Sequence, residues 1–131
     1  MTDYCPCGNN KTYADCCEPI INRVKKAETA EELMRSRYTA FTKANINHLM
    51  RTHHSSTRPL KQRNSMLKWM NNTDWLGLVV VKTQGGQAKD TSGHVEFRAI
   101  YIEDGQTEVI HENSLFEKEN GEWVYVSGIH Y

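Results

Sequence analysis

The stretch CPCGNNKTYADCC, residues 5–17, holds all four cysteines of this 131-residue chain and decides how its N-terminal part can fold. Its thiols follow the spacing C-x-C-x8-C-C, with Gly8 and two asparagines suited to a tight turn between them. Tetrahedral Zn(II) takes four thiolates at about 2.3 Å and leaves no coordination position open. The spacing therefore predicts one structural Zn(II) per chain, with four ligands: Cys5, Cys7, Cys16 and Cys17.

Other uses of four clustered cysteines fit this sequence less well. Disulfides need an oxidising compartment, and a vicinal Cys16–Cys17 bridge would strain the intervening peptide. An iron–sulfur cluster also takes four cysteines, but the spacing matches neither common ferredoxin pattern. A redox role, in which oxidation of the thiolates releases the metal, is a weaker alternative because four thiolates alone do not imply it. Zinc-catalysed hydrolysis is excluded because a closed site cannot activate water.

Composition limits the remaining function classes. Sixteen Lys and Arg are balanced by sixteen Asp and Glu, so the chain carries no strong nucleic-acid signal, although a local basic patch is compatible with this balance. No apolar run approaches the length of about 18 residues that a membrane-spanning helix needs. The N-terminus lacks the basic and apolar regions of a secretory signal, so we expect a cytoplasmic protein. No P-loop pattern is present.

Helical patterns occupy the first half of the chain. Residues 29–32, Thr-Ala-Glu-Glu, form a capping box, and apolar side chains then recur at helical spacing to about Lys43. A short helix is expected over residues 47–53. Pro59 can start a third helix, which residues 71–73 end.

From Trp75 onward the hydrophobic period changes to two. Residues 75–81 are apolar on both faces, which predicts a strand covered on both sides. A second strand follows around residues 95–101. Two hairpin signals, Asp104-Gly105 and Asn120-Gly121, then bound strands at 107–119 and 122–129. Helices first and an antiparallel meander afterwards define an α+β fold.

Polar residues interrupt the third predicted strand at its centre. His111 and Asn113 share one face with apolar neighbours, whereas Glu112 and Ser114 share the other. A buried carboxylate must find a partner, and the first long helix offers hydrogen-bond donors. The candidate pocket residues are Arg35, Arg37, Tyr38, His54, His111, Glu112 and Ser114.

Two interpretations of these polar residues remain open. In the functional one, Arg35 or Arg37 anchors an anion in a pocket, and His54, His111 or Glu112 acts as acid or base. In the structural one, which we favour, an Arg–Glu pair and a Ser or His hydrogen bond fasten the helix to the sheet. His53 and His54 are interpreted as surface or helix-end residues, because the spacing of a second metal site is absent.

Residues 5–17 resemble the SEC-C motif, the zinc-binding segment best known from the C-terminal tail of the SecA translocation ATPase. All four ligand positions match, and Glu18 stands where glycine or histidine is often found. Residues 33–41, 74–78 and 111–116 are similar to the YchJ family of uncharacterised bacterial proteins. Some members of that family carry a second SEC-C copy at the C-terminus, which this sequence does not contain.

The resemblance implies a zinc knuckle over residues 1–25 and, over residues 26–131, a domain like nuclear transport factor 2 (NTF2), whose curved, cystatin-like sheet forms a conical pocket. It also implies protein docking by the knuckle, with partners in translation, secretion or quality control. We therefore expect an adaptor or binding protein rather than an enzyme. The alternative is a small isomerase, cyclase or hydrolase acting on a small molecule in the pocket. Folds of this kind often form homodimers through the open sheet face.

Overall fold

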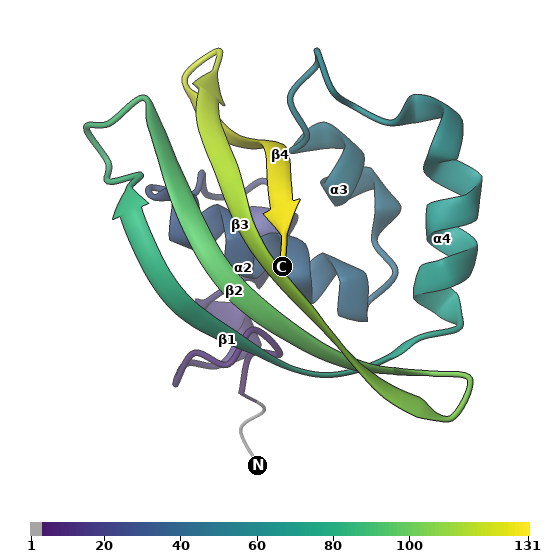
Figure 1. Ribbon diagram of the computed structural model, residues 1–131. Coiled ribbons are helices and arrows are strands. Elements are labelled where there is room, and N and C mark those ends of the chain that lie inside the picture. The colour runs from purple at the N-terminus through teal and green to yellow at the C-terminus, as the bar shows by residue number, and fades with distance from the viewer. Residues whose placement is uncertain (1–3) are drawn as a thin grey trace.

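The computed structural model describes residues 4–131, in which helices cover one side of a curved antiparallel sheet (Figure 1). Residues 1–3, which the predicted knuckle segment includes, lie outside the described residues. The sheet has the order β1-β2-β3-β4. Its strands are β1 (Asp74–Gly85), β2 (Ser92–Glu103), β3 (Gln106–Glu119) and β4 (Glu122–His130). The predicted α+β meander is confirmed.

Two tight turns set the register of the meander. Asp104 and Gly105 both have positive φ, 51° and 78°, and Asn120 and Gly121 repeat this pattern with 54° and 80°. Two successive residues in this region make the hairpin turn whose twist matches that of the strands. Each turn therefore pairs the residues that flank it, Glu103 with Gln106 and Glu119 with Glu122.

The helices precede the sheet in the chain. They are η1 (Tyr13–Asp15), α1 (Glu18–Ile21), α2 (Ala30–Thr42), α3 (Ile46–Arg51), η2 (Leu60–Gln62) and α4 (Arg63–Asn71). The Thr29 hydroxyl accepts a hydrogen bond from the Glu32 amide at 3.1 Å, as the capping box predicts. None of the helices in residues 4–131 has the length and apolar character needed to cross a membrane.

The start predicted for the third helix was wrong. Pro59 has φ −86° and ψ 64°, outside the helical region, and a 3-10 turn follows before α4 begins at Arg63. Leu60 lies in that turn and is 65% exposed, so it does not belong to the apolar stripe of α4.

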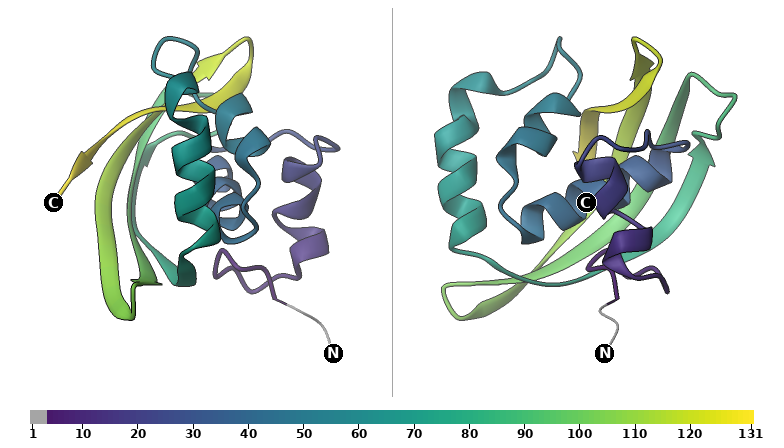
Figure 2. Two further views of the ribbon diagram at one scale, coloured as in Figure 1. Left: turned by 90° about the vertical axis from the view of Figure 1, so that its right-hand side faces the viewer. Right: turned by 180° about the vertical axis from the view of Figure 1, so that it is seen from behind.

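The main core lies between α2 and the concave face of the sheet, and the N-terminal segment packs beside α2 (Figure 2). Leu33, Met34 and Tyr38 of α2 meet inward-facing residues of the strands. Cys5, Cys7 and Cys17 belong to this same core rather than to a separate one. Helices α3 and α4 form a smaller cluster with the C-terminal end of α2.

The expectation that the first strand is covered on both sides was wrong. Leu78 of β1 is buried, but Leu76, Val79 and Val81 are 56%, 51% and 45% exposed. The reason is that the helices cover only one face of the sheet in residues 4–131 (Figure 2). The convex face of β1 therefore presents apolar side chains to solvent.

The loop between β1 and β2 depends on a close approach of two glycines. The Gly86 carbonyl accepts a hydrogen bond from the Ala30 amide at 2.9 Å, which ties the loop to the start of α2. A Cβ on Gly93 would overlap the backbone of Gly86, whereas a Cβ on Gly77 would meet nothing within 4 Å.

We therefore expect Gly93→Ala to lower the free energy of unfolding by about 1–3 kcal/mol, since the backbone must shift to admit the methyl group. Gly77→Ala is the matched control, and its effect should be neutral or slightly stabilising. Urea denaturation followed by tryptophan fluorescence measures both. Equal stability of the two variants would contradict the packing described for this loop.

Candidate metal centre and cone pocket

The four cysteine sulfurs form a cluster that fits a single metal ion. Their Sγ atoms all lie within 4.8 Å of one another, and all four thiols are free. The Sγ atoms of Cys7 and Cys16 are 3.6 Å apart, and those of Cys16 and Cys17 are 3.9 Å apart. A tetrahedron with metal–sulfur bonds of about 2.3 Å has edges of about 3.8 Å. The spacing of the donors thus suits tetrahedral coordination.

Local backbone contacts bring the two halves of the motif together. The Cys5 amide donates to the Lys11 carbonyl at 2.8 Å, and the Gly8 amide donates to the Cys5 carbonyl at 3.2 Å. Gly8 has φ 89°, a conformation that a residue with a side chain rarely adopts. The Thr12 hydroxyl then caps η1, which leads directly to Cys16. The turn around the sulfurs is therefore encoded by residues between the ligands.

Hydrogen bonding between the clustered thiols shifts their pKa values in opposite directions. Hydrogen bonding with Cys17 lowers the pKa of Cys5, while hydrogen bonding with Cys5 raises the pKa of Cys17. One thiol of this pair therefore ionises at the expense of the other. Four thiolates can coexist at this spacing only when a cation lies among them, which is the chemistry that a metal ion supplies.

The cysteine cluster is tied to α2 as well as to its own loop. Cys5, Cys7 and Cys17 are at most 4% exposed, whereas Cys16 is half-buried. The Cys5 sulfur lies 3.7 Å from the Thr39 hydroxyl of α2. Arg35 donates from Nη1 to the Cys7 carbonyl at 2.8 Å and from Nε to Glu31 at 2.9 Å. Arg35 therefore braces the knuckle.

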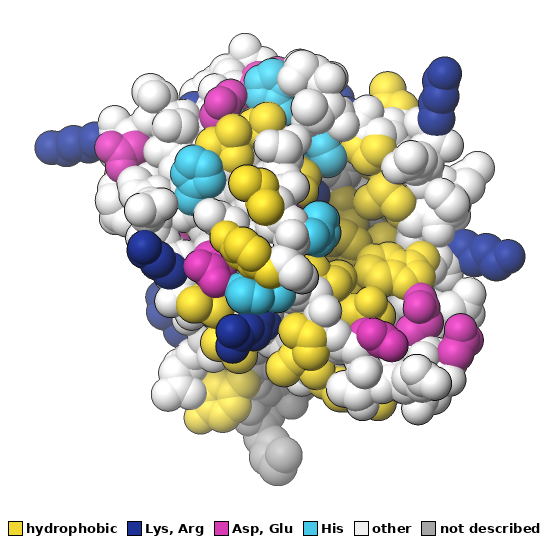
Figure 3. Space-filling model, in the orientation of Figure 1, with side chains coloured by type: hydrophobic (Ala, Val, Ile, Leu, Met, Phe, Trp, Pro, Cys, Tyr) yellow, Lys and Arg dark blue, Asp and Glu magenta, His cyan; other side chains and the backbone are white. Residues whose placement is uncertain are grey.

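A cavity of about 310 Å³ lies between the sheet and helices α2 and α4. Figure 3 shows recessed hydrophobic side chains in the hollow between the sheet and α4. We call this cavity the cone pocket. Its lining is mainly apolar and aromatic, and it includes Met34, Phe41, Met66, Trp69, Trp75, Phe97, Ile110 and Phe116.

Glu112 provides the carboxylate of the cone pocket. It is 6% exposed, and its Oε2 accepts hydrogen bonds from Ser114 at 2.5 Å and from the Tyr125 hydroxyl at 3.0 Å. Its Oε1 lies 3.3 Å from Nε2 of His130. A Cβ at Gly128 would overlap the Glu112 side chain, so β4 approaches this carboxylate because position 128 is glycine. Three neighbours thus fix the carboxylate in one place.

Arg37 is the buried cation of the same pocket. Its Nη1 donates to the Leu49 carbonyl at 2.9 Å and to the Thr52 hydroxyl at 2.8 Å, and its guanidinium lies 4.8 Å from the centroid of the Tyr125 ring. Burial lowers the pKa of Arg37 to about 10, so the guanidinium remains charged at neutral pH. Tyr125 lies between Arg37 and Glu112. Its ring contacts the Arg37 guanidinium, and its hydroxyl donates to the Glu112 carboxylate.

One wall of the cone pocket is built of aromatic rings. Trp75 stands nearly perpendicular to Trp69, with ring centroids 5.3 Å apart, and both rings contact Phe41 and Tyr101. The Trp69 indole N–H donates to Glu103 at 2.5 Å. The Trp75 indole N–H is buried and has no hydrogen-bond partner among the described residues. Such edge-to-face packing holds a rigid apolar surface.

The structure brings together four of the seven predicted pocket residues. Arg37, Tyr38, Glu112 and Ser114 line the cone pocket, from α2 and from the inward face of β3. Arg35, by contrast, contacts the knuckle.

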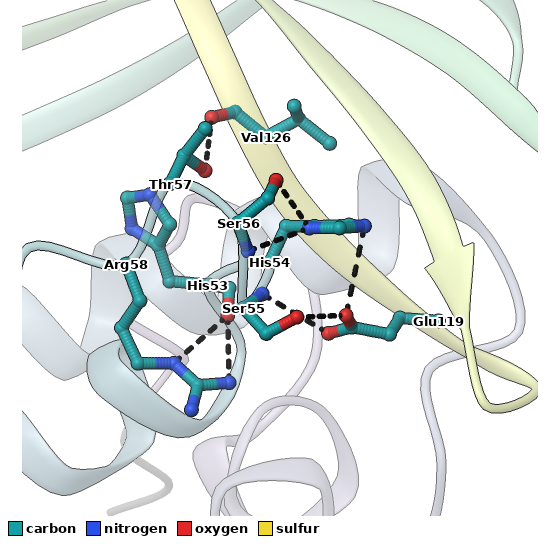
Figure 4. A network of polar contacts seen from close by, with 8 residues as sticks. All are labelled: His53, His54, Ser55, Ser56, Thr57, Arg58, Glu119 and Val126. Atoms are coloured by element: carbon teal, nitrogen blue, oxygen red, sulfur yellow. Dashed lines mark hydrogen bonds and ion pairs between the residues drawn. The ribbon is translucent and has the colours of Figure 1, made fainter.

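The two histidines among the seven lie elsewhere. His111 is on the opposite face of β3, where its Nε2 lies 2.7 Å from Glu96. His54 lies in the loop after α3, where its Nδ1 accepts from the Ser56 amide and its Nε2 faces Glu119 at 3.6 Å (Figure 4).

Sequence reasoning missed several residues of the cone pocket. His53, interpreted as a surface or helix-end residue, does follow the C-cap of α3, but it is half-buried and lines the cone pocket, with its ring centroid 5.0 Å from that of Tyr125. Burial lowers the pKa of His53 to about 4, so its imidazole is neutral at neutral pH. The isolated bridge that pairs His53 with Tyr125 joins segments far apart in the chain, and no local pattern could have indicated it.

The fold and the cysteine cluster define an NTF2-like domain that carries an N-terminal SEC-C type knuckle. Residues 29–128 match the family model described as YchJ, middle NTF2-like domain. A UPF0225 protein of Geobacter sulfurreducens is 41% identical over 98% of this chain and 80% of its own length. UPF0225 protein YchJ of Shigella dysenteriae is also 41% identical, over 98% of this chain and 84% of its own. The chain belongs to the YchJ (UPF0225) family.

Solved structures agree with this assignment. The solution structure of a SEC-C motif containing protein from Rhodopseudomonas palustris matches with a TM-score of 0.88 and 34% identity, over 100% of this chain and 99% of that chain. A crystal structure of a SEC-C motif containing protein from Psychrobacter arcticus matches with a TM-score of 0.80 and 28% identity, over 94% of this chain and 80% of that chain. The resemblance seen in the sequence is confirmed.

Each cysteine of the predicted four-thiolate site would supply one corner of a tetrahedron, so we expect Cys16→Ser to reduce bound metal well below one ion per chain. Cys16 is half-buried, so the change does not open the core. Elemental analysis of purified protein by mass spectrometry measures the metal content. Asp15→Ser, at the exposed neighbouring position, should keep full occupancy, and equal metal in both variants would show that Cys16 is not a ligand.

Proposed function

We propose that this protein binds a small apolar molecule in the cone pocket and that the four cysteines hold one structural Zn(II). The observation that carries the first part is the cavity of about 310 Å³ with Glu112 fixed inside it. Ligand pockets are commonly of this size and combine apolar walls with a few placed polar groups. The pocket is mostly hydrophobic, and its charged side chains are Arg37 and Glu112.

The chemistry of the wall defines the class of ligand. The rings of Trp69 and Trp75 offer flat apolar surface, and the Glu112 carboxylate accepts hydrogen bonds. The unpartnered indole N–H of Trp75 is a donor that a ligand oxygen or nitrogen would satisfy. A flat, largely apolar molecule that carries an N–H or O–H donor therefore suits the pocket best.

The zinc assignment rests on the donor set. Thiolates are soft ligands that favour Zn(II) over hard cations, and a four-thiolate tetrahedron is a common structural zinc site. Three of the four sulfurs share the core of α2 and the sheet, so the ion would stabilise the whole fold. In this assignment the metal holds the knuckle against α2 and takes no part in chemistry in the cone pocket.

Catalysis in the same pocket is the alternative. Glu112 would be its acid or base, with Arg37 and Tyr125 as neighbours. The hydroxyl groups of Ser114 and Tyr125 both donate to Oε2 of Glu112, and this arrangement fixes the carboxylate as a hydrogen-bond acceptor. We therefore favour binding over turnover.

A fluorescent probe of matching chemistry tests the pocket. N-phenyl-1-naphthylamine is flat and apolar, carries one N–H, and becomes more fluorescent in apolar surroundings. We expect it to bind the intact protein and to bind Trp69→Ala about tenfold more weakly, because a stacked aromatic contact is lost. Leu76→Ala, on the exposed convex face, is the control for surface binding and should leave the affinity unchanged. Equal losses in both variants, or no binding, would reject the pocket as the site.

We also propose a second candidate function, protein docking through the N-terminal segment, because two apolar side chains of that segment face solvent. Tyr4 is 68% exposed and Val24 is 82% exposed. Covering such exposed apolar surface with a partner protein would be favourable. The partners proposed by analogy with SEC-C segments belong to translation, secretion or quality control.

Cosedimentation with purified ribosomes tests the first of these partner classes. We expect Val24→Asp to abolish cosedimentation, because a charge at the contact opposes desolvation. The control, Val81→Asp, places the same charge on the exposed convex face of the sheet and should have no effect. Failure of the intact protein to cosediment would remove ribosomes from the candidate partners.

A further inference from the structure

A second cavity, of about 390 Å³, lies between the N-terminal segment, α3 and the β3–β4 turn. It shares no lining residue with the cone pocket. Five cationic side chains line it: Arg23, Lys25, Lys26, Arg51 and Arg58. Only two carboxylates, those of Glu119 and Glu122, accompany them among the described residues. In a chain with a net charge of zero, this is a strong local excess of positive charge.

Two of the arginines are held in place by hydrogen bonds to uncharged groups. Arg51 donates from Nη2 to the Ile21 carbonyl at 3.1 Å, and the same nitrogen lies 3.0 Å from Nδ1 of His48. Burial lowers the pKa of His48 to about 3, so its ring is neutral and can accept. Arg58 donates from Nε and Nη2 to the His53 carbonyl at 3.1 and 2.9 Å (Figure 4). Both guanidinium groups are thus positioned without losing their charge.

Within the part of the chain that the structure describes, the two lining carboxylates form no ion pair with the arginines of the cavity, whereas Lys25 pairs with Glu32 at 3.8 Å. Glu119 accepts hydrogen bonds from the Ser55 amide at 3.2 Å and from the Ser55 hydroxyl at 2.5 Å, and it faces His54 (Figure 4). Glu122 is exposed at the turn. Within residues 4–131, no carboxylate oxygen lies within 4.0 Å of Arg23, Arg51 or Arg58.

Arg23 occupies an unusual backbone conformation at the edge of this cavity. Its φ of 64° lies in the left-handed region, which costs a residue with a side chain about 1 kcal/mol. Hydrogen bonds hold it there, from the Arg23 amide to the Ile20 carbonyl at 3.2 Å and from the Val24 amide to the Pro19 carbonyl at 2.9 Å. The chain leaving α1 is thereby turned so that Arg23, Lys25 and Lys26 border the cavity.

We infer that this cavity binds the phosphate group of a small phosphorylated molecule. A guanidinium presents planar N–H donors that match phosphate oxygens, and a doubly charged anion would relieve the repulsion among the lining cations. The site is a bounded cavity rather than a long basic stripe, and the chain as a whole is neutral, so an extended nucleic-acid backbone fits it poorly. The anion would join the N-terminal segment to α3.

Isothermal titration calorimetry of the metal-loaded full chain with inorganic pyrophosphate, at constant ionic strength, tests this site. We expect binding to the intact protein and an affinity about tenfold lower for Arg51→Gln, because a charge-assisted hydrogen bond is lost. Arg51 also donates a hydrogen bond to the Ile21 carbonyl, so its substitution could affect folding as well as binding. A second variant separates the two effects. Arg23→Gln combined with Lys26→Gln changes two exposed residues and should weaken binding while the thermal midpoint stays constant.

Arg98→Gln is the matched control, since Arg98 is exposed on β2 and lines neither cavity. Its pyrophosphate affinity should equal that of the intact protein. No pyrophosphate binding, or the same affinity in all variants, would overturn the inference. A single-stranded RNA oligomer that binds the intact protein more tightly than pyrophosphate does would overturn it as well, if Arg98→Gln and Arg51→Gln weaken RNA binding equally. That result would show diffuse electrostatic association.

Discussion

Burial of the cysteine cluster against α2 is the contact on which the rest of this structure depends. Three sulfurs lie in the same core as Leu33 and Met34, and Arg35 and Thr39 reach from the helix to the knuckle. The same helix supplies Arg37 and Tyr38 to the cone pocket. One helix therefore contacts both the cysteine cluster and the cone pocket, although the two sites contain different residues.

Local patterns predicted the secondary structure well where a single residue type imposes a conformation. The capping threonine of α2 and the two hairpin turns lie where the sequence placed them. The alternation of β3 correctly put Glu112 and Ser114 on the face opposite His111. The start of α4 was misplaced because the φ restriction of proline leaves ψ free, and the ψ of 64° at Pro59 lies outside the helical region.

Prediction of the pocket was limited by contacts between distant segments. Tyr125 and His53 meet through a bridge between β4 and the loop after α3, and the aromatic wall joins α2, α4, β1 and β2. Coverage of β1 was misjudged because an apolar run reveals hydrophobicity but not which layers surround it. The clustering of the four cysteines was easier to predict because they lie close together in the chain.

Gly128 links the pocket to the dynamics of the sheet. This glycine lets the edge strand β4 lie directly against the Glu112 side chain, and beyond the isolated bridge at Tyr125 the strand pairs with β3 alone among the described residues. Edge strands open locally at much lower free energy than central ones. Fraying of residues 127–130 would therefore hydrate the Glu112 carboxylate before any global unfolding occurs, and amide exchange in this short segment would report that local opening.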